Sequence, residues 1–476
     1  MSVAAPSPVE TSEFFRTCGF DLAAGETATL WERTEGWAAG LRLAAIALTS
    51  EPDPARFIAD AARTEAVVSD YLFREVIDRQ PPDLQEFLLR TSVADRLTAE
   101  LAEMLSGDRD ARDRLELLER GGVFLTAVDD TRTMFRYHAL FGALLRARLR
   151  AQRPDEAQDL ARRAATWFAD HDMAPEAEVH ARRAADWELL GALLCSRWLR
   201  SVIDGAGDRP LPFDLLLDAA PDEPALALLA YAEAVSIRDR AHADRWRSQW
   251  AAMAAPADDE QALVLGLVDV MYGRTFGATA ESVSASARVR AACLAAGREL
   301  DVLRVVALVR EAELCLDVGD IDEAVALLYE ARREAVETNA PWIGCEAAAS
   351  PAFVAACRGD LRDAEAWLRE TLEREQPART TGSLHDIVGV TSALLHAARG
   401  RNAHALSAVA AAAGARDSSA LVRDAAALVV EVLDPRSARR AAARNPILTE
   451  VLVSLGDLER VSESGQPPAA TTASAR

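Results

Sequence analysis

Residues 319–324 read Gly-Asp-Ile-Asp-Glu-Ala, and the motif returns as Gly-Asp-Leu-Arg-Asp-Ala at 359–364 and, more weakly, as Gly-Arg-Asn-Ala-His-Ala at 400–405. Successive copies begin 40 and 41 residues apart. Glycine ends a helix in a left-handed conformation, aspartate caps the start of the next helix, and an acidic residue three positions later completes a capping box. The final alanine falls where two helices must approach closely. The motif therefore predicts helical hairpin repeats, longer than the ~34 residues of a tetratricopeptide repeat and best described as tetratricopeptide-like.

Around these three copies, residues 221–460 form the predicted repeat region. Degenerate units are expected over 221–297, where Trp246 and Trp250 lie four residues apart. Stacked repeats bury one another's apolar faces, so we expect a curved stack whose concave face carries the binding site. Residues 151–220 are expected to be a helical connector, and residues 461–476, which lack apolar periodicity, a disordered tail.

One segment departs from the helical pattern. Residues 123–138 contain two β-type runs around a polar turn at 129–132, which predicts a β-hairpin. Short helical patterns precede the hairpin at 68–79, 82–91, 98–105 and 112–120, and another follows at 139–150. Helices followed by a hairpin indicate a winged-helix domain over residues 51–150. The predicted fold class is thus mostly α, with a remnant of a lid helix in residues 1–50, a winged helix with one hairpin, and an α-solenoid.

The charge of the chain excludes several kinds of chemistry. All 53 basic residues are arginine, and the formal net charge is −22. Without lysine there is no Schiff-base lysine and no phosphate-loop lysine, and an acidic chain lacks the positive surface that nucleic-acid binding requires. No apolar run approaches the ~18 residues of a spanning helix, and the N-terminus has no secretory pattern. We therefore expect a cytoplasmic protein that binds neither nucleic acid nor membrane.

Five segments resemble, in the same order, the MalT-like regulators, which are large LuxR-type transcription factors built on a signal-transduction ATPase with numerous domains. The resemblance lies in Thr34–Ala45 (Thr-Glu-Gly-Trp-Ala-Ala-Gly-Leu-Arg-Leu-Ala-Ala), Phe87–Val93, Leu118–Leu125, Phe135–Phe141 and Arg163–Trp167. It implies a layout of ATPase domain, lid, winged helix, inducer-binding helical sensor and C-terminal helix-turn-helix. Of these parts we expect only the middle ones here, because the sequence contains no G-x-x-x-x-G-K-[ST] motif and no LuxR-type helix-turn-helix.

The resemblance also implies two nucleotide contacts. In related ATPase switches a winged-helix histidine contacts the phosphates of ADP, which corresponds to His138, and the lid lines the adenine pocket, which corresponds to Trp37. The alternative for His138 is that it caps the following helix or packs beside Tyr137. The alternative for Trp37 is an apolar helix face, shared with Leu41 and Leu43, that packs on an ATPase domain. We favour both alternatives and expect no ATP or ADP cofactor, because the phosphate loop is missing.

No other residue pattern indicates catalysis or a metal site. The six cysteines form no C-x-x-C pair, and buried free thiols are the simplest interpretation. His396 and His404 are eight residues apart, too far for one face of a single helix and without a third ligand. Residues 205–210 begin like a dinucleotide-binding loop, but Pro210 replaces the third glycine.

The sequence therefore predicts a non-enzymatic, signal-sensing fragment of a MalT/LuxR-type regulator that binds an inducer or a protein through its helical repeats. Three alternatives remain: a truncated or split regulator with its other parts on another chain, a nucleotide-binding or catalytic ATPase switch, and a DNA-binding winged helix. The last is disfavoured because residues 60–80 carry five acidic residues against three arginines.

Overall fold

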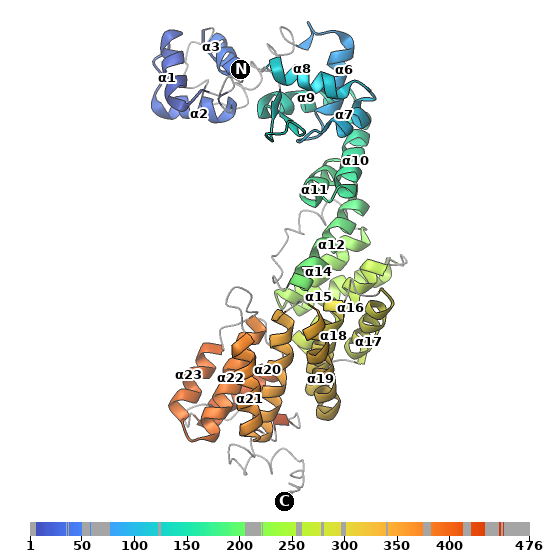
Figure 1. Cartoon of the computed structure of the whole chain (residues 1–476), viewed down its shortest axis with the longest axis vertical. Helices are drawn as coiled ribbons and strands as arrows, with labels where there is room; N and C mark the ends of the chain where they lie inside the picture. Colours follow the sequence, from blue (N-terminus) through green and yellow to red (C-terminus); the bar gives the residue numbers. More distant parts are fainter. Residues whose placement is uncertain are drawn as a thin grey trace, which may run out of the picture. The chain divides into compact units, whose positions relative to one another are not determined.

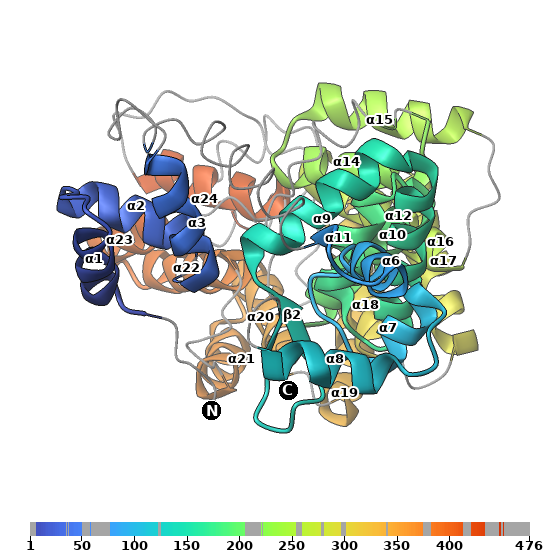
Figure 2. The same ribbon diagram turned by 90° about the horizontal axis from the view of Figure 1, so that it is seen from above.

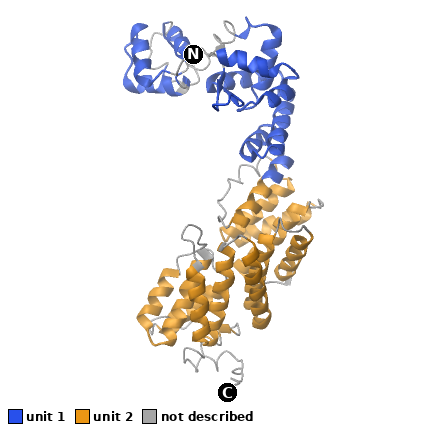
Figure 3. Ribbon diagram, viewed as in Figure 1, with its two compact units in different colours: residues 1–193 blue, residues 194–476 orange. Residues whose placement is uncertain are grey.

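The computed structural model describes residues 6–34, 36, 38–49, 58, 77–121, 125–204, 220, 222–253, 259–277, 280–296, 301–338, 341–374, 382–412, 420–433, 447–448 and 451. The chain divides into two compact units, residues 1–193 and 194–476 (Figure 3). Both are built almost entirely from helices (Figure 1). The expected mostly-α fold class is confirmed.

The first unit begins with three helices that share a small core. They are α1 (Pro8–Thr17), α2 (Ala24–Thr34) and α3 (Ala38–Thr49). Ser7 and Glu10 form a capping box that starts α1, and Phe15, Leu30 and Leu41 are at most 1% exposed. Leu43 is also buried, at 7% exposure. Leu41 and Leu43 thus pack inside this chain, which is a correction to the interpretation that they form a face left for an ATPase domain.

The winged helix follows the predicted order. It comprises α6 (Pro82–Thr91), α7 (Ala99–Ser106), α8 (Ala111–Gly121), β1 (Leu125–Ala127), β2 (Phe135–Tyr137) and α9 (Ala139–Gln152). The strands pair antiparallel with Leu125 opposite Tyr137, and Phe135 also exchanges two backbone hydrogen bonds of 2.8 Å with Leu97. The expected helix over residues 68–79 lies, except for its last three residues, outside the described part of the chain.

The turn of the hairpin is organised by one carboxylate. Asp129 accepts hydrogen bonds from the Thr131 hydroxyl at 2.5 Å, from the Thr133 hydroxyl, and from the backbone N–H groups of Thr133 and Met134, both at 3.0 Å. These donors hold the pKa of Asp129 well below its usual range, the threonine hydroxyls contributing most. The polar residues that predicted a turn in the sequence therefore form a turn held by its own hydrogen bonds.

Three further helices complete the first unit and enter the second. They are α10 (Pro154–Asp170), α11 (Ala174–Arg183) and α12 (Trp187–Asp204), the last of which crosses the division between the units. The 205–210 segment that follows lies outside the described residues.

The second unit is a succession of antiparallel helix pairs. The pairs are α14 (Pro224–Ser236) with α15 (Arg240–Ala252), α16 (Asp259–Phe276) with α17 (Ala280–Ala296), α18 (Asp301–Val318) with α19 (Ile321–Glu337), α20 (Pro341–Arg358) with α21 (Leu361–Arg374), and α22 (Gly382–Ala398) with α23 (Asn402–Ala412). The first helices α14, α16, α18, α20 and α22 pack on one another in a row. A last helix, α24 (Ala420–Leu433), lies beside α22 and α23 (Figure 2). The predicted tail, residues 461–476, lies outside the described residues.

The corner motif has the geometry that its residues predict. Gly319, Gly359 and Gly400 have φ of 89°, 80° and 70°, and the next residue at each corner donates its backbone N–H to a carbonyl five residues earlier at 2.8–2.9 Å. This is the Schellman arrangement that closes a helix. Asp320 then accepts the Glu323 N–H at the start of α19, and the motif alanines 324, 364 and 405 are all 0% exposed. The 40-residue period is therefore one helix pair.

Replacing Gly359 by valine is expected to lower the free energy of unfolding of the repeat unit by about 1 kcal/mol or more, because a β-branched side chain is strained at φ of 80°. Gly359→Asn is the matched control, since asparagine tolerates this conformation. Urea denaturation of the three proteins gives the comparison. Equal stability of the valine variant and the wild type would contradict the corner geometry.

The cysteines are all free, and five of the six are buried. The exception is Cys18, which is exposed, so the expectation of buried thiols holds for the others. In the described part of the chain, no helix combines the length and the apolar character needed to cross a membrane.

Candidate functional site: a groove between two repeats

The structure describes one of the two residues, His138 and Trp37, for which the sequence resemblance implies a nucleotide contact. His138 occupies the N-cap position of α9, is partly buried, and accepts the Gly142 N–H on its backbone carbonyl at 2.9 Å. Its side chain makes no capping hydrogen bond, so the capping alternative holds for the backbone alone. Trp37 lies outside the described residues. The proposed nucleotide contacts of both residues stay predictions.

Several arginines in and next to the winged helix form ion pairs with carboxylates. Arg146 and Arg183 both pair with Asp95, at 3.3 and 2.8 Å. Arg148 pairs with Asp78 at 3.0 Å, and Arg153 with Glu86 at 2.8 Å. Neutralised guanidinium groups are poor contacts for a phosphate backbone. The charge of residues 60–80 disfavours DNA binding, but most of these residues lie outside the described part of the chain. The absence of DNA binding therefore stays a prediction.

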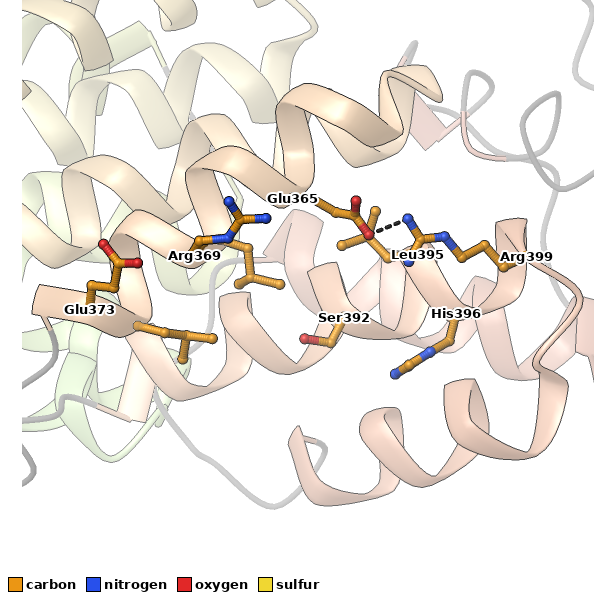
Figure 4. Close-up of a pocket in the computed structure, with 9 residues that line it drawn as sticks. Glu365, Arg369, Glu373, Ser392, Leu395, His396 and Arg399 are labelled. Atoms are coloured by element: carbon orange, nitrogen blue, oxygen red, sulfur yellow. Dashed lines mark ion pairs between the residues drawn. The ribbon is translucent and has the colours of Figure 1, made fainter.

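An open groove lies between α21 and α22, which belong to consecutive repeats (Figure 4). These two helices pack less closely than α17 with α18 or α19 with α20, which occupy equivalent positions. The space between them measures about 520 Å³. Its walls are formed by Glu365, Leu368, Arg369, Leu372, Glu373, Ser392, Leu395, His396 and Arg399. Ligand pockets commonly measure about 300–1,000 Å³, so this groove has the size for a small molecule.

The groove combines an apolar wall with polar groups. Leu368, Leu372 and Leu395 form the apolar part, and Leu372 remains 50% exposed. Glu365 and Arg399 pair with each other across the two helices. Arg369 is exposed and has no ion-pair or hydrogen-bond partner in the described part of the chain. A free cation beside the half-exposed Leu372 is a combination that an anionic molecule with an apolar body fits.

Two polar side chains of α22 complete the groove. Ser392 donates its hydroxyl to the Val388 carbonyl at 2.7 Å. His396 has no hydrogen-bond partner on Nδ1 within the described residues. Burial and then the neighbouring His404 lower the pKa of His396, so the ring is neutral at pH 7. It presents a neutral hydrogen-bonding group to the groove.

His396 and His404 lie close together, and the expectation that their spacing runs along a single helix is wrong. The two residues lie on different helices, α22 and α23, and their ring centroids are 5.5 Å apart. Gly400 ends the first helix between them, so the eight-residue spacing does not run along one helix. Within the described residues, no three His, Cys, Asp or Glu side chains are grouped as metal ligands.

The sequence alone did not identify the residues that line the groove. Leu368 and Leu372 have the spacing of an ordinary buried helix face, and nothing in the sequence shows that α22 leaves them partly open. Arg369 gives no such signal, because it lies with Glu365 and Glu373 on a charged row of α21 beside the apolar stripe.

Comparison with known proteins identifies the winged helix and the overall fold. Residues 73–157 match the MalT winged helix domain. The serine/threonine-protein kinase PknK of two Mycobacterium tuberculosis strains and of Mycobacterium bovis is 36% identical over 168 residues, which are 35% of this chain and 15% of the kinase. The chain thus spans a small part of these relatives.

A solved structure covers nearly the whole chain. It is a signal-transduction ATPase with numerous domains and a tetratricopeptide repeat sensor from Pyrococcus horikoshii, with a TM-score of 0.50 and 14% sequence identity. The alignment covers 97% of this chain and 71% of that protein. A MalT-type winged helix followed by a tetratricopeptide-like repeat unit is therefore the architecture of this chain.

Proposed function

We propose that this MalT-like chain is a non-enzymatic sensor module of a transcriptional regulator, and that it binds a small organic anion in the groove between α21 and α22. The observation that carries the proposal is Arg369, which has no partner among the described residues, beside the half-exposed Leu372 in a space of about 520 Å³. The MalT-type winged helix and the repeat-sensor fold support the regulatory role.

The groove's chemistry selects the class of ligand. Arg369 provides a charge-assisted hydrogen bond to a carboxylate or phosphate, and Ser392 and His396 provide neutral polar contacts. Leu368 and Leu372 favour an apolar body next to that anionic group. Purely polar ligands would leave the leucines in contact with water, and purely apolar ligands would leave the polar groups without partners.

The position of the groove supports a route for the signal. Each repeat contacts mainly its neighbours, so a change in the packing of one pair is passed along the stack. Because α21 and α22 belong to consecutive repeats, a ligand that bridges them alters the angle between these repeats. We infer that the winged helix reads this change and passes it to DNA-binding or ATPase parts of a regulator, in the same or another chain.

Replacing Arg369 by glutamine is expected to weaken anion binding about tenfold, since a hydrogen bond to a charged group contributes about 1.5 kcal/mol. The probe is 8-anilinonaphthalene-1-sulfonate, an anion with an apolar body whose fluorescence rises on binding. Titrations of the full chain give the dissociation constant.

Arg362→Gln is the matched control, because Arg362 is exposed on the same helix but does not line the groove. It is expected to bind the probe like the wild type. If both glutamine variants bind the probe as tightly as the wild type, the groove is not the anion site.

A further inference from the structure

The side of α21 that lines the groove carries a row of charges of alternating sign. Glu365, Arg369 and Glu373 are four residues apart and all belong to the groove wall (Figure 4). Leu368 and Leu372 form an apolar row beside them. Residues four apart on a helix have Cβ atoms about 5–6 Å from each other. Two opposite charges on one small molecule can therefore meet two neighbours of this row at the same time.

The members of the charged row differ in whether they have a partner. Glu365 pairs with Arg399 of α22. Arg369 and Glu373 have no ion-pair or hydrogen-bond partner within the described residues. On a helix, a glutamate four residues before a basic residue is the favourable order, and the reverse order is weaker. Because Arg399 holds Glu365, Arg369 is left with its less favourable neighbour, Glu373, and both charges remain available to a ligand.

The charges that line the groove sum to zero, although the whole chain has a formal net charge of −22. Arg369 and Arg399 balance Glu365 and Glu373, and His396 is neutral at pH 7. A ligand with only an anionic group gains the attraction of Arg369 but also meets the carboxylate of Glu373. A ligand that carries both charges pairs with both side chains, so the groove favours a zwitterion.

The charged row is particular to this repeat. Counted from the motif alanines 324, 364 and 405, the positions of its first two members hold Val325 and Tyr329 in the preceding repeat and Leu406 and Ala410 in the next. The stacking of the repeats therefore does not require charges at these positions. The row occurs where α21 and α22 leave a space of about 520 Å³ between them.

We propose that the ligand of the groove is an α-amino acid with an apolar side chain, whose carboxylate binds Arg369, whose ammonium group binds Glu373, and whose side chain lies on Leu372. This inference rests on the proposed function and narrows it, because the carboxylate of the amino acid is the anionic group that Arg369 binds. Both charged groups of an α-amino acid are attached to one carbon, and the long side chains of Arg369 and Glu373 can converge on them from adjacent positions of the row.

The test compares three small molecules that share a phenyl ring and differ in charge. L-Phenylalanine carries both charged groups, 3-phenylpropanoate lacks the ammonium group, and 2-phenylethylamine lacks the carboxylate. Each competes with 8-anilinonaphthalene-1-sulfonate for the full chain, and the fall in fluorescence gives its dissociation constant. Phenylalanine should bind about fivefold more tightly than 3-phenylpropanoate, the gain expected from one half-exposed charge pair. 2-Phenylethylamine should not displace the probe.

Glu373→Gln removes the carboxylate and keeps the size of the side chain. In this variant phenylalanine should lose its advantage, while the affinity for 3-phenylpropanoate stays that of the wild type or rises. Arg369→Gln should weaken the binding of both carboxylates. Asp363→Asn is the matched control, because Asp363 is exposed on the same helix and does not line the groove. It should keep the wild-type preference for phenylalanine.

The outcomes distinguish this inference from the proposed function. If 3-phenylpropanoate binds as tightly as phenylalanine and Arg369→Gln weakens it, the groove binds a simple anion, so the proposed function holds and the amino-acid ligand is wrong. A preference for phenylalanine that persists in Glu373→Gln also contradicts the inference, because another group then binds the ammonium. If neither carboxylate displaces the probe from the wild type, the inference is wrong, and the effect of Arg369→Gln on the probe itself decides the proposed function.

Discussion

Arg310→Met is expected to lower the free energy of unfolding of the repeat unit by about 3–5 kcal/mol, the cost of leaving one side of a buried ion pair without its partner. Arg310 is 12% exposed and lies between Glu313 and Glu346, which are 4% and 1% exposed. Burial alone would lower the pKa of Arg310, but attraction by Glu346 and Glu313 outweighs it and raises the pKa. Methionine has a similar shape without the charge, so the buried Glu346 would lose its ion pair with Arg310.

Urea denaturation followed by circular dichroism measures this loss. Arg288→Met is the matched control, since Arg288 is exposed on α17 and, within the described residues, donates its side-chain hydrogen bond to Ser284 of its own helix. It should change stability by no more than about 0.5 kcal/mol. Combining Arg310→Met with Glu346→Leu should recover part of the loss, because both charges are then absent. A loss below 1 kcal/mol for Arg310→Met alone would mean that water reaches Arg310 and its partners Glu313 and Glu346.

Local structure was predictable where the signal lies within a few neighbouring residues. Gly359 and Asp360 fix a corner through backbone geometry alone, and the structure reproduces it. The hairpin was recognisable because a polar turn separates two β-type runs, and Asp129 makes that turn with residues two to five positions away. Such interactions depend on sequence order and hardly on tertiary packing.

The buried ion pairs around Arg310 were not predictable, because the paired residues come from different repeats. In the sequence, Arg310 and Glu313 have the spacing of an ordinary solvent-exposed pair on one helix. Their burial depends on Glu346 in the next repeat and on Arg274 in the preceding one. Only the stacking of the repeats shows that these charges are enclosed.

The candidate groove and the position of α24 depend on how closely helices pack. The sequence predicts that α21 and α22 are neighbours, but not that they remain apart enough to leave about 520 Å³ between them. Likewise, the stripe of Leu421 and Val422 predicts one buried face and does not identify the surface that buries it. Helix α24 packs against α16, α18 and α22, a placement that depends on the stacking of the repeats.

The first unit is expected to lose about 3 kcal/mol of stability between pH 6.5 and pH 4 through one residue, His180. Its side chain is 0% exposed and stacks on Phe168, with ring centroids 5.0 Å apart and planes 8° from parallel. Neither ring nitrogen has a hydrogen-bond partner within the described residues. Burial, followed by repulsion from Arg183, lowers the pKa of His180 to about 4, although Asp95 opposes the shift.

The direction of the effect follows from proton binding in the two states. Above pH 6.5 His180 is neutral in both the folded and the unfolded chain, and it contributes no pH dependence. As the pH falls below 6.5, the unfolded chain binds a proton that the folded chain excludes until the pH reaches about 4. The stability that depends on neutral His180 is therefore fully present above the pKa that this residue has in the unfolded chain, and it is lost as the pH falls towards 4. The loss is 1.36 kcal/mol for each unit by which the pKa in the folded chain lies below the pKa in the unfolded chain.

His180→Leu removes the titrating group and keeps an apolar side chain against Phe168. Its stability should equal or exceed that of the wild type at pH 7, and the difference in its favour should grow by about 3 kcal/mol as the pH falls to 4. Comparing the two proteins at each pH cancels the titration of the carboxylates that they share. Parallel profiles for His180→Leu and the wild type would show that the folded chain protonates His180 near its normal pKa, which requires water or a carboxylate to reach the ring.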